Sequence, residues 1–324
     1  MVWSSSRISI GKDRWNRRYY LKSTFGLVGV ISAAGCSGQG SSYDEHISAA
    51  QESITNAEEK LQTEADKFNS ENLDSGGVDI QTAAIYDYLD TAEEELNAAE
   101  SSANQSQEES IQAAQNWIDV AREITEFLDI FAEGYSQASS GFAYIQSERF
   151  SDAVDELITA EETLSSANEQ LTITEEAWDE IDRSKVEDIE DISIAEIENS
   201  FSQLKEVMSV LTPMVSGMIS LSEGLVDYQD GSEAYDAGQY TEAENKFRAA
   251  SDDFTVAHST FKEQEEAAPE SMTNSIIELT CYSGAIRDAS THLANAVEAT
   301  QNGNRNRANE EAEKANEAVD RCSL

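Results

Sequence analysis

Histidines and carboxylates are the side chains of this sequence best suited to acid–base or metal chemistry. There are three histidines, His46, His258 and His292, among 64 acidic residues. None stands in a Glu-x-x-His or His-x-x-x-His arrangement, so the ligand spacings of di-iron bundles and zinc peptidases are missing. No calcium loop, Gly-x-Ser-x-Gly elbow or phosphate-binding glycine loop occurs either. We therefore predict a protein that is not an enzyme, with no catalytic residue, cofactor or specific metal site.

Cysteines are the remaining candidates for covalent chemistry, at positions 36, 281 and 322. Cys281 and Cys322 are equidistant from Gln301-Asn302-Gly303, where we expect a turn between two helices. In an antiparallel helical hairpin such residues lie side by side, so the pair predicts a disulfide in a protein outside the cytoplasm. The alternative is two separate buried thiols.

The first 36 residues have the features of an export signal. Arg17 and Arg18, followed by Tyr19-Tyr20-Leu21-Lys22 and a mildly apolar run, resemble a twin-arginine signal peptide, here residues 1–35. Ala33-Ala34-Gly35-Cys36 resembles a lipobox, whose cysteine is lipidated, and residues 36–42 then form the lipidated Cys36 and a flexible linker. These resemblances imply an exported protein, anchored through Cys36 to the outer face of the cytoplasmic membrane. The alternative is an uncleaved membrane-associated segment with a buried thiol.

The net charge limits the partners that the chain can bind. It is −43 over 324 residues, and the composition resembles that of surface proteins of extremely halophilic archaea. Such a surface repels nucleic acid and anionic lipid head groups, so we expect neither as a ligand. Disorder is the other explanation of so acidic a composition. Regularly spaced apolar residues among the acids favour a folded protein.

Helices are the elements that must position any site in this chain. Apolar residues from Ala50 to Phe68 recur at steps of three and four, which places them on one face of a helix. The same pattern resumes after Gly76-Gly77 and continues to the C-terminus. We predict an all-α domain over residues 43–324, built of long antiparallel, coiled-coil-like hairpins stacked in an elongated bundle or solenoid. The expected hairpins cover 43–105, 106–185, 188–268 and 270–324.

An internal repeat with an offset of 90 residues links two of these hairpins. Phe131–Leu171 aligns without gaps on Leu221–Phe261, and glycines and alanines match between the copies. The second helix of each copy alternates large and small apolar residues every three or four positions, which lets two helices approach closely. We interpret this pattern as core packing.

The turns between the helices resemble those of tetratricopeptide repeats. Ala234-Tyr235-Asp236-Ala237-Gly238-Gln239-Tyr240, with Ala243 and Phe247 after it, is similar to the inter-helix turn of one such unit. The other copy has Glu148 where the turn glycine would stand, and Gly303 begins a third variant. The family period is about 34 residues, so we expect tetratricopeptide-like hairpins with long arms and no true array. The resemblance implies a protein or peptide partner.

A pair of tryptophans and two prolines give further expectations about the helices. Trp117 and Trp178 are equidistant from the turn at Ser147-Glu148, so we expect the two rings to be neighbours. Pro213 lies inside a helical pattern and is expected to kink or interrupt that helix. Pro269 stands where a helix can begin without the amide hydrogen that proline lacks.

From these observations we expect a lipid-tethered surface protein that acts as a helical scaffold or a protein- or peptide-binding module. Candidate partner contacts are Tyr135, Tyr228 and Tyr235, for which core packing is the alternative. A second hypothesis is a small-molecule receptor with a ligand near Trp117, Trp178 and Pro213. A closed apolar cavity of several hundred cubic ångströms would favour the receptor.

Overall fold

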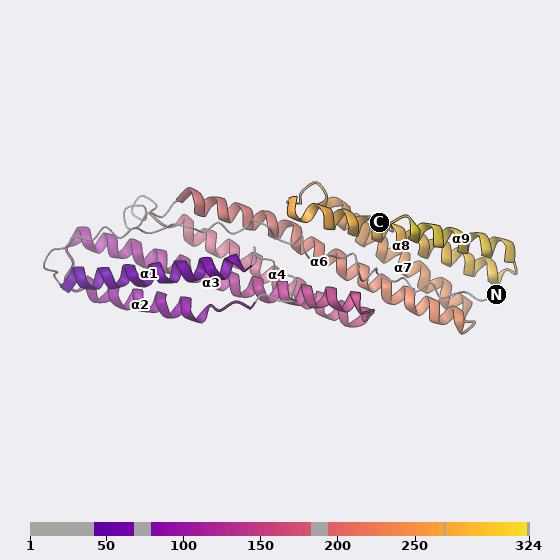
Figure 1. Cartoon of the computed structure of the whole chain (residues 1–324), viewed down its shortest axis with the longest axis horizontal. Coiled ribbons are helices and arrows are strands. Elements are labelled where there is room, and N and C mark those ends of the chain that lie inside the picture. The colour runs from indigo at the N-terminus through magenta and orange to yellow at the C-terminus, as the bar shows by residue number, and fades with distance from the viewer. Residues whose placement is uncertain (1–41, 68–78, 183–193, 269, 323–324) are drawn as a thin grey trace. The chain divides into compact units, whose positions relative to one another are not determined.

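The computed structural model describes residues 42–67, 79–182, 194–268 and 270–322 (Figure 1). These residues form eight α-helices and no strand, and 89% of the structure is helical. The all-α prediction is therefore confirmed. Each predicted hairpin range contains two of the described helices. The export signal and Cys36 lie outside the described residues.

The described chain divides into two compact units. We call residues 42–135 and 163–208 the N-terminal unit, and residues 136–162 and 209–322 the C-terminal unit. The helices α3 (Gln105–Gln146), α4 (Phe150–Asp179) and α6 (Ile194–Asp236) contribute residues to both units. Each unit is described by itself below.

The N-terminal unit begins with two helices that pack against each other, α1 (Ser42–Asp66) and α2 (Ala83–Glu100). The apolar face predicted for the first of them is buried, at Ala50, Ile54, Ala57, Leu61 and Ala65. The facing residues of α2 follow the same period: Ile85, Leu89, Ala92, Leu96 and Ala99. Three- and four-residue steps keep such a stripe on one side of a helix, so each helix needs a partner to bury it.

A buried carboxylate fixes the end of α1. Glu64 has no exposed side-chain surface, and it binds Lys60 at 2.6 Å and also Lys67. The backbone N–H of Gln81, just before α2, donates to the same carboxylate over 2.9 Å. Burial alone would raise the pKa of Glu64, but these bonds outweigh it and hold that pKa below its usual value. Both lysines near this end of α1 therefore already have a partner.

In the C-terminal unit, α7 (Tyr240–Gln264) and α8 (Glu270–Gln301) make extensive contacts, and α9 (Arg305–Asp320) packs on α8 (Figure 1). The buried face of α7 alternates alanine and phenylalanine, as its sequence predicts: Ala243, Phe247, Ala250, Phe254, Ala257 and Phe261. In α9, by contrast, only Ala315 and Ala318 are buried. The last helix therefore contributes little apolar area to the core.

Glycines explain how the two repeat copies pack. In the C-terminal unit, a Cβ added to Gly224 would come within 2.5 Å of the Phe254 ring, and one added to Gly231 within 3.1 Å of Phe247. At the matching position of the N-terminal unit, a Cβ on Gly134 would meet Leu164 at 2.9 Å. Each glycine thus makes room for a large side chain from the next helix. Close approach of the two helices requires a residue without a Cβ at these points.

Three hairpin turns share one backbone geometry. Glu148, Gly238 and Gly303 have positive φ angles of 61°, 75° and 71°. In each turn this residue donates its N–H to the carbonyl three residues back, and the next residue donates to the carbonyl five back, which defines a Schellman motif. The left-handed conformation suits glycine, so Glu148 occupies it at a conformational cost.

Pro213 does not interrupt its helix. The structure places it inside α6, which continues from Ile194 to Asp236, so of the two expected effects, a kink or an interruption, the interruption is wrong. Buried neighbours on the same helix, among them Leu211, Met214 and Val215, hold the backbone helical in spite of the lost amide hydrogen. Residues Glu198–Asp236 of α6 also have the length and composition of a membrane-crossing helix, yet 56% of their most apolar stretch is buried inside the protein, as in a core helix.

Covalent and aromatic contacts join residues that the hairpin arrangement pairs. Cys281 of α8 and Cys322, just after α9, form a disulfide with their Cα atoms 5.9 Å apart. The rings of Trp117 and Trp178 meet edge to face, with centroids 6.0 Å apart. The antiparallel pairing predicted from equal distances to a turn therefore holds for both residue pairs.

Candidate functional site

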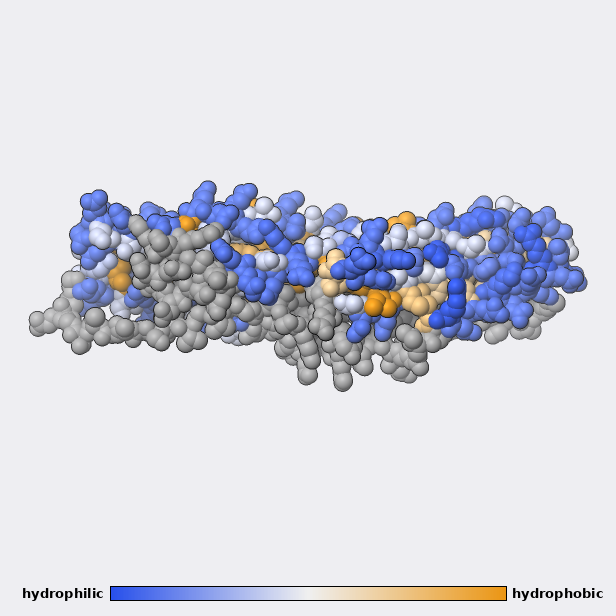
Figure 2. Space-filling view, turned by 90° about the horizontal axis from the view of Figure 1, so that it is seen from above, coloured by the Kyte–Doolittle hydropathy of each residue, from blue (hydrophilic) through white to orange (hydrophobic). Residues whose placement is uncertain are grey.

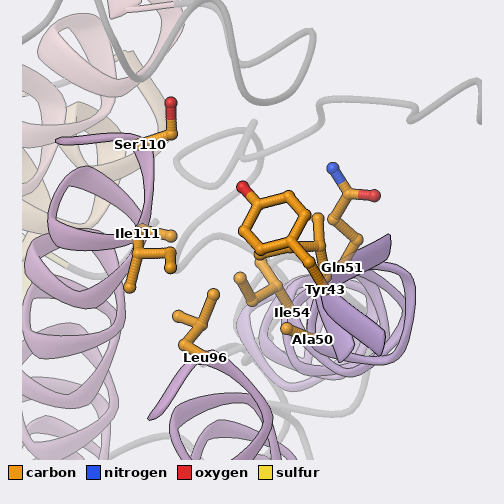
Figure 3. A pocket seen from close by; sticks show the side chains of 9 residues that line it. Tyr43, Ala50, Gln51, Ile54, Leu96, Ser110 and Ile111 are labelled. Carbon is orange, nitrogen blue, oxygen red and sulfur yellow. The ribbon is translucent and has the colours of Figure 1, made fainter. Parts of the chain in front are cut away.

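A pocket lies at the N-terminal end of α1, and we call it the α1 pocket (Figure 3). Its volume is about 200 Å³. The lining residues of α1 are Tyr43, Ile47, Ala50, Gln51 and Ile54. The other two helices supply Leu96 from α2 and Ser110, Ile111 and Ala114 from α3. Three helices of one unit thus border a partly open space with both apolar and polar lining residues.

The apolar and polar groups of the pocket separate. Figure 3 shows Leu96, Ile54 and Ile111 facing the gap between the helices. The hydroxyl of Ser110, the hydroxyl of Tyr43 and the amide of Gln51 lie on the opposite side of the view from Leu96. The site therefore combines an aliphatic floor with groups that can exchange hydrogen bonds at its rim.

Helical spacing explains why the pocket forms at this point. Residues 43, 47, 50 and 54 continue the apolar stripe of α1 towards its first turn. Ala50 and Ile54 are almost fully buried, as are the residues further along the same face. Tyr43 and Ile47 are only half-buried, so the open part of the pocket lies at the first turn of α1.

A polar contact lies one helical turn further along both α1 and α3. Glu58, four residues after Ile54, accepts a hydrogen bond from Trp117 Nε1 over 3.0 Å. Burial raises the pKa of Glu58 to about 7, although the bond from Trp117 acts in the opposite direction. His46 of α1 contacts Glu95 of α2 at 2.6 Å. Polar pairs thus join α1 to both of its neighbours.

The charge around the α1 pocket is negative. Residues 42–59 and 91–121 contain many Asp and Glu residues and no Lys or Arg. The next arginine on α3, Arg122, is already bound to Asp90 at 2.8 Å and to Glu93 at 2.6 Å. A ligand at this pocket therefore meets a field that favours positive charge.

The three candidate tyrosines lie within the helix packing. Tyr135 is buried, and the ring of Tyr228 meets that of Phe247 at 5.6 Å. Tyr228 and Tyr235 pack against the core cluster around Phe247. Burial also raises the pKa of Tyr228 to about 12. These positions support the core-packing alternative for all three residues.

The receptor hypothesis places a ligand near Trp117, Trp178 and Pro213, and it needs a closed apolar cavity of several hundred cubic ångströms. The two tryptophan rings contact each other, and a hollow in the described part of the same unit measures about 10 Å³. It is lined by residues such as Phe127, Leu171 and Phe201 and has room for a single water-sized group. Its volume is far below the several hundred cubic ångströms that the hypothesis needs.

Most of the visible described surface is hydrophilic (Figure 2). The large apolar side chains that are exposed are distributed over several helices, for example Tyr88 on α2, Ile158 on α4 and Val256 on α7. Within the described residues, no group of three or more His, Cys, Asp or Glu side chains is arranged to hold a metal ion. The α1 pocket is therefore the feature of the described chain best suited to contact another molecule.

Comparison with known proteins gives no relative from which a function could be inferred. No family model, curated protein or solved structure matches this chain. Arg17, Arg18 and Cys36 lie outside the described residues, so export and lipidation stay predictions. Sequence reasoning missed the α1 pocket because its Ile, Leu and Ala residues follow the same period as a filled core. The absence of basic residues around it was a signal in the sequence.

Proposed function

We propose that this protein is a non-enzymatic, lipid-anchored surface protein whose helical hairpins serve as a scaffold or a protein- or peptide-binding module. The paired arginines Arg17 and Arg18 and the lipobox-like sequence before Cys36 support export and anchoring. The sequence offers no nucleophile or metal motif that would support catalysis.

The observation that carries the binding function is the α1 pocket, on a helical structure whose described surface in Figure 2 is mostly hydrophilic. Long helices position its lining residues rigidly, because α1 and α2 bury continuous apolar faces against each other. A preorganised apolar site loses little conformational freedom when a partner binds. The charge around it selects partners electrostatically.

Export and anchoring can be tested by changing the residues proposed to direct them. Replacing Arg17 and Arg18 by lysine should leave the full-length chain in the cytoplasm, and Cys36→Ser should release an exported chain from membranes. The mass of the N-terminal peptide of the membrane form measures the lipid directly. An unmodified Cys36 within an intact N-terminus would contradict the anchor.

The binding role can be tested by affinity capture from membranes at high salt, with the tethered protein as bait. We expect a defined protein to be enriched over a bait of similar charge that has been unfolded. Loss of that partner in a bait with a filled α1 pocket would link the binding to this site. Recovery of the same proteins with both baits would refute a folded binding module.

A further inference from the structure

We propose that the α1 pocket binds one bulky apolar side chain, phenylalanine or leucine, presented by a basic peptide segment of a protein partner. This inference rests on the proposed binding function and adds the place of the site and the chemistry of the partner. Three observations support it: the size of the pocket, the arrangement of its polar groups and the charge around it.

The volume suits one side chain. An apolar cavity of about 150 Å³ accommodates benzene, so a pocket of about 200 Å³ has room for a phenyl ring or a leucyl group. Pockets for drug-sized ligands measure roughly 300–1,000 Å³. The α1 pocket is therefore too small to enclose such a ligand and large enough for an anchoring residue, the kind of contact that dominates many interfaces.

The polar rim suits a peptide main chain. Gln51 can both donate and accept hydrogen bonds, and the hydroxyls of Tyr43 and Ser110 can do the same. These groups lie on the side of the pocket away from Leu96, where the backbone of an inserted residue would pass (Figure 3). A side chain seated on the aliphatic floor therefore brings its own amide groups to the rim.

The charge favours a basic segment. Exposed Glu45, Glu100 and Glu108 each lie within about one helical turn of a lining residue in the sequence. Lys60 and Arg122, the nearest cations along α1 and α3, are bound to carboxylates of the same unit. Lysines or arginines that flank the anchoring residue would therefore find acidic partners without local competition.

The test uses the purified protein and a short synthetic peptide in which lysines and glycines alternate around one central phenylalanine. Fluorescence anisotropy of the labelled peptide measures its affinity. Replacing the phenylalanine by glycine should weaken binding at least about tenfold, since the apolar contact is lost. Replacing the lysines by glutamates should abolish binding, and added salt should weaken it.

Variants of the protein locate the binding. Ala50→Leu fills the pocket from α1, and Ser110→Phe covers it from α3, so each should weaken peptide binding at least about tenfold. Thr63→Phe introduces the same aromatic group at an exposed position of α1 outside the pocket and should leave the affinity unchanged. Circular dichroism establishes that each variant is folded before it is compared.

Each other outcome overturns the inference. Unchanged affinity in both folded pocket variants would show that the peptide does not bind at the α1 pocket. Equal binding of the glutamate peptide would show that the partner need not be basic. Equal affinity for free N-acetylphenylalanine amide would assign the pocket to a small molecule. If membrane capture still enriches a partner with the Ala50→Leu bait, the binding function stands and only this site fails.

Discussion

The α6–α7 and α8–α9 hairpins of the C-terminal unit reverse direction in the same way, yet different interactions hold them closed. Gly238 and Gly303 adopt the same left-handed conformation in their turns. Along α7, buried phenylalanines fill space left by glycines of α6. Along α9, only two alanines are buried, and a disulfide and ion pairs act in addition. A common turn sets the direction of two helices, whereas the side chains beyond it set how strongly they adhere.

Polar pairs of the last hairpin join α8 to the middle of α9 and to the residue just after it. His292 of α8 contacts Glu311 at 2.8 Å, and Asp288 of α8 contacts Arg321 at 2.6 Å. Exposed ion pairs contribute little stability each, about 0–1 kcal/mol. The disulfide is therefore the main difference between a closed and a frayed last helix.

The largest loss of stability is expected from removing a phenylalanine of the α6–α7 hairpin. Phe254 has no exposed surface, so Phe254→Ala should cost about 3–5 kcal/mol of unfolding free energy through lost burial and the cavity left behind. Denaturant titration followed by circular dichroism measures this loss. Val256→Ala, at a side chain that is 53% exposed on the same helix, is the matched control and should change stability by less than about 0.5 kcal/mol. Equal effects of the two changes would contradict phenylalanine packing as the main contact.

Removing the disulfide should have the next largest effect. The bond joins residues 41 positions apart, and a closed loop of that size contributes about 3–4 kcal/mol. Replacing Cys281 and Cys322 by serine should therefore accelerate hydrogen exchange over residues 305–320, and much less so in α7. A reductant should reproduce this change in the parent protein and do nothing to the double variant. Unchanged exchange in α9 would show that the ion pairs suffice.

Lowering the pH should change the stability of the two hairpins in opposite directions. The pKa of Asp253 on α7 is raised to about 6, mainly because the side chain is partly buried. The negative charges of Asp227, Glu223 and Asp252 raise it further. The folded state then binds more protons than the unfolded chain between about pH 4 and 6, so acidification through this range stabilises α7. In the last hairpin, bonds from Arg321 and Arg287 outweigh burial and lower the pKa of Asp288. Its stabilising effect is lost as the pH falls below about 4.

A neutral substitution of Asp253 tests its share of this pH dependence. Asp253→Asn should stabilise the protein by about 1 kcal/mol at pH 7, a value reduced for the partial exposure of the side chain, and by almost nothing at pH 4. Denaturant titrations at the two pH values measure the difference. Glu263→Gln, at an exposed position of α7, serves as control and should show no such pH-dependent gain. The same gain at both pH values would rule out protonation of Asp253 as its origin.

The smallest effect concerns the turn that the hairpins share. Glu148 occupies the conformation that glycine occupies at 238 and 303, so Glu148→Gly should stabilise its hairpin by about 0.5–1 kcal/mol. Gly238→Ala should destabilise by a similar amount, although a Cβ there meets no neighbouring atom. Thermal unfolding measures both changes. Opposite signs are expected, and equal signs would mean that the turns are not equivalent.

The helices and their buried faces could be predicted because burial repeats with the helical period. Their spacing alone predicts that Phe247, Phe254 and Phe261 belong to the core, and all three are buried. Trp117 and Trp178 were paired by their equal distance from a turn, which needs no knowledge of the final packing. Local sequence thus specifies these features without information about distant residues.

The features that escaped prediction depend on what lies opposite a residue. Ile47 has the spacing of a core residue, but it is only half-buried and lines the α1 pocket. Pro213 is tolerated because buried neighbours hold its helix together. Tyr228 was a candidate contact, and its ring packs on Phe247. Periodicity identifies a buried face but does not show how completely another helix fills it.

The bond between Cys281 and Cys322 also changes what a break in the chain would do. A protease that cut the exposed turn at residues 302–304 would separate α8 from α9 in sequence, and the C-terminal fragment would stay attached through its sulfur. The nicked protein would keep its full mass until a reductant was added. The last helix can therefore survive damage to its own loop, a useful property for a chain proposed to face extracellular proteases.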